Sequence, residues 1–175
     1  MMTRAGLDSS LREHREALDS YLARARRIPE ARWTLAPASG KWSPGEITEH
    51  LRIALERLER ELAGEPALRC LLPAWRRFVL RLTVLPRMLR RGRFPRGVPA
   101  PREIRPSTSG PPRDLALASL SRALDRFGAA SADPSARRRL THPYFGRLRL
   151  DRFHRLLALH TRHHGEQLPD GPERS

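Results

Sequence analysis

The sequence feature that most constrains the fold is a helical stripe near the end of the chain, in which histidines and apolar residues share one face. The stripe consists of Phe153, Leu157, His160, His164 and Leu168. Spacings of three and four residues place these side chains on one side of a helix, and the phenylalanine and leucines must face a core. Burying an unpaired imidazole costs a few kcal/mol, so both histidines need partners. The two histidines are one helical turn apart and can also bind one metal ion together, so both interpretations stay open at this point.

The length and composition favour one helical domain. A chain of 175 residues is long enough for a single core, and aliphatic residues are plentiful while aromatic residues make up only 6%. The single cysteine, Cys70, excludes an internal disulfide and is expected to be buried and inert in its apolar stretch. No run of about 18 apolar residues is present, and charges begin at Arg4, which argues against a membrane span and a secretory signal. We therefore expect a cytoplasmic protein with one domain over residues 1–175.

The net charge of +15 is carried almost entirely by arginine, since Lys41 is the only lysine. Such skewed usage, together with abundant alanine and proline, is also typical of a GC-rich genome. No helix-turn-helix or zinc-finger signature accompanies the charge. Nucleic-acid binding is therefore disfavoured as a function.

Four segments have the apolar periodicity of bundle helices. They are residues 9–28, 43–63, 113–131 and 151–168. Ser10 with Glu13 resembles a capping box for the first segment, and Ser43 with Glu46 forms a clearer one for the second, where Pro44 fits the first helical position. No segment alternates convincingly as a strand. The predicted fold class is all-α, with a four-helix bundle as the simplest architecture.

The segment at about 67–112 interrupts this pattern between the second and third helices. It has no acidic residue between Glu65 and Glu103, and it carries nine arginines from Arg69 to Arg96. Leucine, tryptophan and phenylalanine alternate with these arginines, which predicts a basic amphipathic helix at about 73–91, followed by a proline-rich connection. We expect its apolar face to dock on the bundle, while peripheral membrane contact through 69–96 is the alternative.

Three motifs stand in a characteristic order along the chain. They are K-W-S-P-G-E-I-T-E-H-L at 41–51, H-P-Y-F-G at 142–146 and H-T-R-H-H-G-E-Q at 160–167. Together they resemble the DinB/YfiT-like superfamily of metalloenzymes, over roughly 8–66 and 113–168. The resemblance implies a four-helix bundle of up-down-down-up type, often dimeric, with a divalent ion held by three histidines. The corresponding ligands here are His50, His160 and His164.

The residues themselves point the same way. His50 lies between Ile47 and Ala54 on the buried stripe of the second helix. Three inward histidines on two helices are hard to explain as packing alone, because each would need a neutral tautomer and a buried acceptor. Three protein ligands leave a coordination position open, which is typical of catalytic zinc. The alternative is a degenerate bundle in which the histidines only pack.

Candidate residues that support the ligands are His14, Glu46 and Gln167. His14 lies on the inward stripe of the first helix, Glu46 is one turn before His50, and Gln167 follows the last histidine pair. The other histidines fall outside the ligand stripe. His154 and His163 are expected to be exposed, and His142 is expected to be structural, because it precedes a proline in a turn.

The resemblance also implies a class of activity. Members of the superfamily include metal-dependent transferases that use bacillithiol, mycothiol or glutathione, and mycothiol-dependent isomerases. The resulting hypothesis is a zinc- or nickel-dependent transferase that joins a low-molecular-weight thiol to a small-molecule substrate. The alternatives are a metal-dependent hydrolase, or a non-catalytic metal-binding or stress-response module whose basic helix binds membranes.

Overall fold

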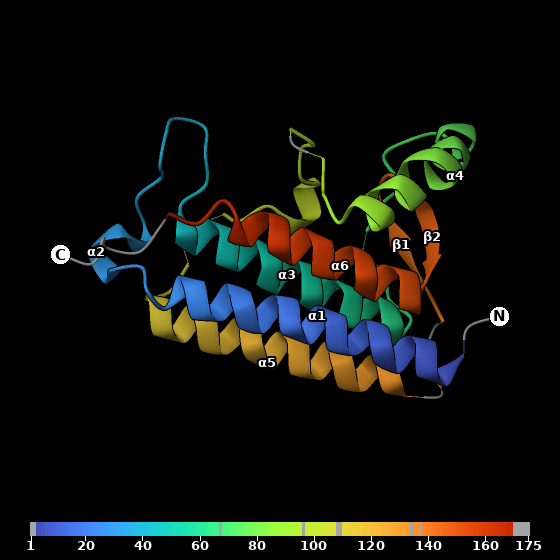
Figure 1. Ribbon diagram of the computed structural model, residues 1–175, viewed down its shortest axis with the longest axis horizontal. Helices are drawn as coiled ribbons and strands as arrows, with labels where there is room; N and C mark the ends of the chain where they lie inside the picture. Colours follow the sequence, from blue (N-terminus) through green and yellow to red (C-terminus); the bar gives the residue numbers. More distant parts are fainter. Residues whose placement is uncertain are drawn as a thin grey trace.

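The structure is a computed structural model that describes residues 3–66, 68–95, 97–107, 110–133, 135–136 and 138–169. Most of these residues are helical, as the sequence predicts. Four long helices lie side by side (Figure 1): α1 (Arg4–Ala25), α3 (Pro44–Leu62), α5 (Arg113–Ala132) and α6 (Leu150–Gly165). Helix α1 packs mainly against α6, and α3 packs mainly against α5. Helices α1 and α6 run in one direction and α3 and α5 in the other (Figure 1).

The core lies between these helices and is closed by large side chains. Tyr21 of α1, Phe127 of α5 and Phe153 of α6 are each almost completely buried. At one end of the bundle, the predicted loop after α1 contains the short helix α2 (Glu30–Trp33). Its Trp33 is buried and donates its indole N–H to the carbonyl of Pro111 at 3.2 Å, so the loop closes that end of the core.

The two predicted capping boxes have different outcomes. Ser43 caps α3 as predicted: its hydroxyl accepts from the backbone N–H of Glu46 at 3.2 Å, and the Glu46 carboxylate accepts from the N–H of Ser43 at 2.7 Å. The prediction of a capping box at Ser10 is wrong, because α1 begins earlier, with Thr3 as its N-cap. The Ser10 hydroxyl therefore sits inside the helix and donates to the carbonyl of Leu7 at 2.8 Å.

The expectation that no strand is present is also wrong. Strands β1 (Arg139–His142) and β2 (Gly146–Arg149) form an antiparallel hairpin that directly precedes α6 in the sequence. Each strand has four residues, too few to show a clear alternation in the sequence. His142 has the structural role expected of it: its Nδ1 accepts the backbone N–H of Tyr144 at 3.2 Å inside the turn. Gly146 ends the turn with a φ of +70°, which explains the glycine of this motif.

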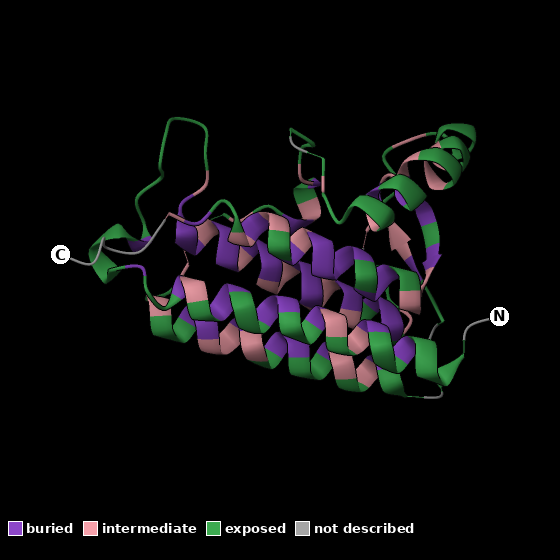
Figure 2. Cartoon of the chain, viewed as in Figure 1, coloured by how far each residue is buried: buried purple, intermediate pink, exposed green. Residues whose placement is uncertain are grey.

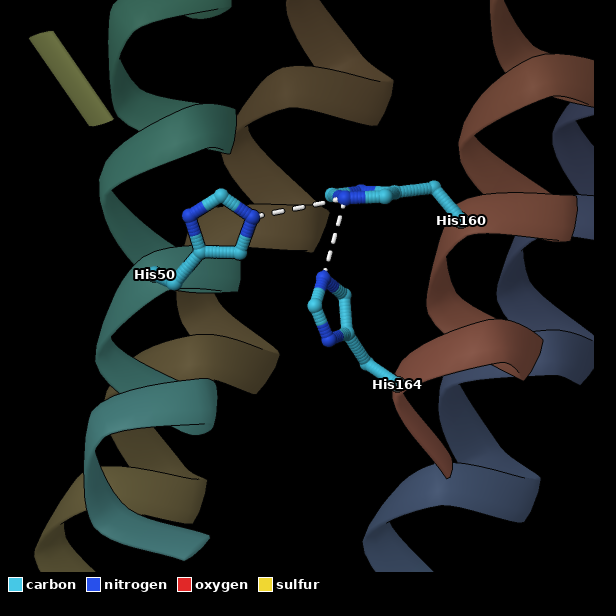
Figure 3. Close-up of side chains that lie close together, drawn as sticks. All are labelled: His50, His160 and His164. Carbon is cyan, nitrogen blue, oxygen red and sulfur yellow. Dashed lines mark hydrogen bonds between the residues drawn. The ribbon is translucent and has the colours of Figure 1, made fainter. Parts of the chain in front are cut away.

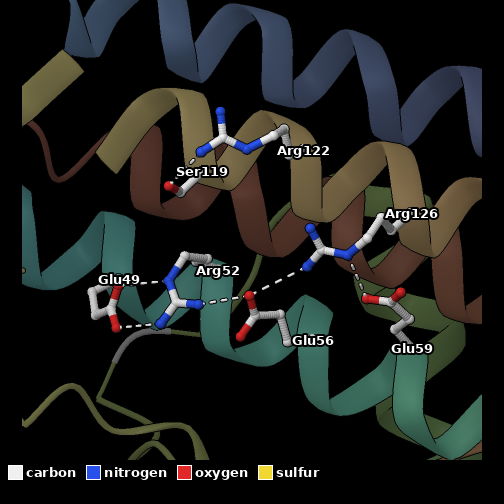
Figure 4. A network of polar contacts seen from close by, with 7 residues as sticks. All are labelled: Glu49, Arg52, Glu56, Glu59, Ser119, Arg122 and Arg126. Atoms are coloured by element: carbon white, nitrogen blue, oxygen red, sulfur yellow. Dashed lines mark hydrogen bonds and ion pairs between the residues drawn. The ribbon is translucent and has the colours of Figure 1, made fainter. Parts of the chain in front are cut away.

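A charged network holds α3 and α5 together on their outer side (Figure 4). Arg52 pairs with Glu49 and Glu56 on its own helix, and Arg126 of α5 reaches across to Glu56 and Glu59. Glu56 thus links the two arginines. Hydrogen bonding to Glu49 raises the pKa of Arg52 above its ordinary value. Because this network borders solvent, each of its ion pairs adds little to the stability of the fold.

The insertion folds partly against the bundle and partly away from it. Helix α4 (Ala74–Arg91) and the 3-10 helix η1 (Arg102–Ile104) both come from this segment. The expected docking of the apolar face holds only for the second half of α4, where Leu85 and Met88 are buried. It is wrong for most of the first half, where Trp75, Phe78, Val79 and Leu82 are exposed, and Figure 2 shows α4 largely in the exposed colour. Arg96 lies outside the described residues. Among the described helices, none combines the length and apolar character needed to cross a membrane.

Candidate metal centre

Three of the predicted site residues meet between α3 and α6 (Figure 3). His50 comes from α3, and His160 and His164 come from successive turns of α6. The Nε2 atom of His160 lies 3.3 Å from Nε2 of His50 and 3.0 Å from Nε2 of His164. One ring nitrogen from each of the three residues lies within 4.8 Å of the other two, so the three histidines could hold a metal ion.

Local sequence explains why these side chains face one another. His50 follows Ile47 by three residues on the buried face of α3, and His164 follows His160 by one turn on the face of α6 that also carries Leu157. His50 and His164 are buried, with exposed fractions of 1% and 6%, whereas His160 is partly exposed. The cluster is therefore enclosed by the bundle on two sides and borders the surface at His160.

Two hydrogen bonds fix the tautomers of the outer histidines. Nδ1 of His50 lies 2.7 Å from the carbonyl oxygen of Ile104 in η1. A carbonyl oxygen only accepts, so Nδ1 of His50 must carry the proton and Nε2 must carry a lone pair. Nδ1 of His164 lies 2.8 Å from Oε1 of Gln167, while the amide nitrogen of Gln167 lies 2.9 Å from Nε2 of His163. With Oε1 of Gln167 placed against His164 in this way, Nδ1 of His164 carries the proton and Nε2 is left as an acceptor.

The consequence is a cluster with more acceptors than donors. With Nε2 of His50 and of His164 both unprotonated, the proton of His160 can satisfy only one of them well. A cation held by the three Nε2 atoms would satisfy all three lone pairs at once. The backbone carbonyl and side-chain amide behind the rings are the partners that metal-ligating histidines usually have. The residues therefore fit a divalent ion.

The protonation states suit the same purpose. Burial lowers the pKa of His50, and burial lowers the pKa of His164 to about 3. Burial, followed by the repulsion of His164 and His50, holds the pKa of His160 well below 6.5. All three imidazoles are therefore neutral at pH 7, and the neutral imidazole is the form that binds metals.

Aromatic rings border the cluster on two sides. The ring of Trp42, from the loop before α3, lies 4.9 Å from the His50 ring and 6.3 Å from the His164 ring, measured between centroids. Phe94, which follows α4, lies 5.2 Å from the His160 ring. The insertion thus contributes both Phe94 and the Ile104 carbonyl to the site. Sequence reasoning missed both, because neither belongs to a motif and a backbone carbonyl leaves no signature in the sequence.

The predicted supporting residues do not all lie at the site. Gln167 contacts His164 directly, as described above. Glu46 is occupied by the capping box of α3. His14 lies elsewhere in the core, with its Nδ1 3.2 Å from Nδ1 of His154, and has no described contact with the three clustered histidines.

Two expectations about other residues are wrong. His154 is completely buried, because α6 is covered on this side by both α1 and α5: its ring lies 4.9 Å from that of Phe127, and its Nε2 lies 3.0 Å from the Ser131 hydroxyl. Cys70 is exposed, and its Sγ accepts a hydrogen bond from Arg77 at 2.7 Å, because the stretch before α4 runs over the surface. His163 is partly exposed, as expected for a histidine outside the ligand stripe.

Comparison with known proteins yields one match, and it covers most of the chain. Neither the curated proteins nor the solved structures contain a match to the chain. The family model of the DinB superfamily matches residues 11–168, which include α3, the hairpin and α6 and therefore all three motifs. The chain belongs to the DinB superfamily.

Proposed function

We propose that this protein binds one divalent metal ion through the Nε2 atoms of His50, His160 and His164. The observation that carries the proposal is the convergence of these three atoms, two of which are held as acceptors by the Ile104 carbonyl and the Gln167 amide. Imidazole nitrogen suits zinc and nickel among the divalent ions, so these two are the first metals to test.

We also propose that residues 1–175 form a single domain, in which the four long helices make a bundle of up-down-down-up type. The directions of the four long helices in Figure 1 and the length of the family match support it. We further propose that the protein forms a homodimer and is located in the cytoplasm. Light scattering of the purified protein measures the first, and a fluorescent fusion in the source cell measures the second.

The proposed activity is a metal-dependent transferase reaction that joins a low-molecular-weight thiol, such as bacillithiol, mycothiol or glutathione, to a small-molecule substrate. When bound, a divalent ion supplies Lewis acidity that lowers the pKa of a thiol or water at its free position. The chain's own residues orient the ligands: the Ile104 carbonyl holds the ring of His50 and the Gln167 amide holds that of His164. Trp42 and Phe94 place apolar rings beside the cluster, and the positive charge of the chain favours anionic thiols.

The metal proposal is tested on untagged protein that has been loaded with zinc or nickel and then desalted. Elemental analysis should find one ion per chain in the wild type and a strong loss in His160→Ala. The variant His163→Ala is the matched control, because it removes a neighbouring histidine of the same helix that is not a proposed ligand. The proposal fails if the loaded wild type retains no ion, or if both variants lose it equally.

The activity is tested separately by conjugation of monochlorobimane to each thiol and to coenzyme A. Turnover should require the ion and disappear in His160→Ala. If the loaded protein instead hydrolyses ester or amide substrates and conjugates no thiol, the function is that of a metal-dependent hydrolase. Inactivity in both assays, with the ion bound, identifies a metal-binding module without turnover.

A further inference from the structure

The first half of α4 exposes a continuous apolar face to solvent. Trp75, Phe78, Val79 and Leu82 are 63%, 54%, 46% and 58% exposed, and their spacing of three and four residues places them on one side of the helix. Leu71, three residues before the helix, is also exposed. An exposed cluster of large apolar side chains on a small protein marks a surface that another apolar surface covers.

The bundle does not cover this face, because α4 is already held from its other side. Leu80 and Val84 lie on the opposite side of the helix and are partly buried against the core, while Leu85 and Met88, in the second half, are buried. In Figure 1, α4 projects from one end of the molecule beyond the four long helices, and in Figure 2 it is mostly exposed. The helix is therefore anchored while its outer apolar face stays free to meet a partner.

Arginines line both edges of the apolar face. With about 3.6 residues per turn, Arg76, Arg87 and Arg90 fall on one side of it and Arg81 on the other. The guanidinium carbon of Arg76 lies 5.1 Å from the centre of the Trp75 ring, so this cation sits directly beside the apolar face. No acidic residue occurs between Glu65 and Glu103, so all the formal charge on α4 is positive.

This combination selects among the possible partners by charge. A second copy of the same face would bring arginines against arginines with no carboxylate to compensate. Nucleic acid matches the charge, but single strands bind by stacking bases on aromatic rings, and Val79 and Leu82, which make up the other half of this face, offer no such surface. An anionic lipid bilayer matches both the charge and the apolar face, because its headgroups can pair with the arginines and its acyl chains can bury the apolar side chains.

We propose that α4 binds the surface of an anionic membrane, lying in the headgroup region with Trp75, Phe78 and Leu82 turned toward the acyl chains. This interaction surface goes beyond the proposed metal-dependent function and does not depend on it. It would place the histidine cluster near the membrane surface, because Phe94, three residues after the end of α4, contacts the His160 ring.

The test uses the full-length protein and vesicles of phosphatidylglycerol and phosphatidylcholine, compared with vesicles of phosphatidylcholine alone. Flotation should recover the protein only with the anionic vesicles, and added salt should release it. Bromine atoms on the acyl chains should quench the fluorescence of Trp75 in the wild type, and the quenching should be lost in Trp75→Phe. This measurement needs no variant that risks misfolding.

Matched variants separate the two parts of the face. Arg76→Gln, Arg87→Gln and Arg90→Gln together should weaken binding about a hundredfold, since each arginine near an anionic surface contributes roughly fivefold. Neutralising three exposed arginines elsewhere (Arg26, Arg27 and Arg32) should weaken it much less. Replacing Phe78 and Leu82 by serine should reduce binding, whereas replacing the equally exposed Leu35 and Leu115 by serine should not.

Three results overturn the proposal. The first is recovery of the protein with neutral and anionic vesicles alike, or with neither. The second is a dimer that the Phe78 and Leu82 serine variant converts to a monomer, which assigns the face to a second copy. The third is tight binding of single-stranded nucleic acid that the same variant abolishes.

Discussion

The buried pair of His14 and His154 makes a quantitative prediction about acid stability. Burial lowers the pKa of His154 to about 4, whereas in the unfolded chain it titrates at its ordinary value of 6.5. Between these two values the unfolded state binds a proton that the folded state does not. The stability that His154 contributes is therefore complete above pH 6.5 and is lost progressively as the pH falls toward 4.

The size of the effect follows from the two pKa values. Each pKa unit corresponds to about 1.4 kcal/mol, so the His154 imidazole alone should remove about 2 kcal/mol of unfolding free energy between pH 7 and pH 5. In His154→Asn this part of the pH dependence should be absent. The pKa of His14 is also held down, first by burial and then by His154, so the loss of His154 flattens the curve further in the same direction.

The assay is urea denaturation at pH 7, 6 and 5 with a chelator present, so that bound metal does not contribute. Ser131→Ala is the control: it removes the hydroxyl partner of His154 and should lower stability by about 1 kcal/mol at every pH while the wild-type slope is retained. If wild type and His154→Asn lose stability in parallel from pH 7 to pH 5, the imidazole is not buried and neutral, and the reasoning is refuted.

Two further predictions concern the site and the helix that carries His50. Gln167→Ala should weaken zinc binding about 10- to 100-fold, because His164 loses the acceptor that orients its ring. Gln167→Glu retains an acceptor, so its zinc affinity in a chelator competition assay should stay within a few-fold of wild type. Equal zinc affinities in all three proteins would contradict this prediction. Ser43→Ala should lower the unfolding free energy by about 1 kcal/mol, because α3 loses its N-cap hydrogen bond. Urea denaturation measures this loss, and Ser20→Ala, at an exposed serine inside α1, is the comparison. An unchanged denaturation midpoint in Ser43→Ala would contradict the capping role.

Sequence alone determined the parts of this protein that depend on local physics. The apolar periodicity of the four long helices and the capping box at Ser43 are short-range features, so they can be identified from the sequence alone. The same holds for the separation of His160 and His164, since any helix places residues four apart on one face. The order of the three motifs carried the family assignment, which the match over residues 11–168 confirms.

The tertiary structure decided what depends on contacts between distant residues. The Ile104 carbonyl that orients His50 is 54 positions away along the chain, and His154 is buried by a partner in α1 140 positions away. Periodicity could not identify which part of α4 the bundle covers, because Phe78 and Leu85 are seven residues apart and fall on the same face of the helix. Only the packed molecule shows that Leu85 and Met88 are inside and Trp75 is outside, since burial is a property of the neighbours that surround a side chain and not of the side chain itself.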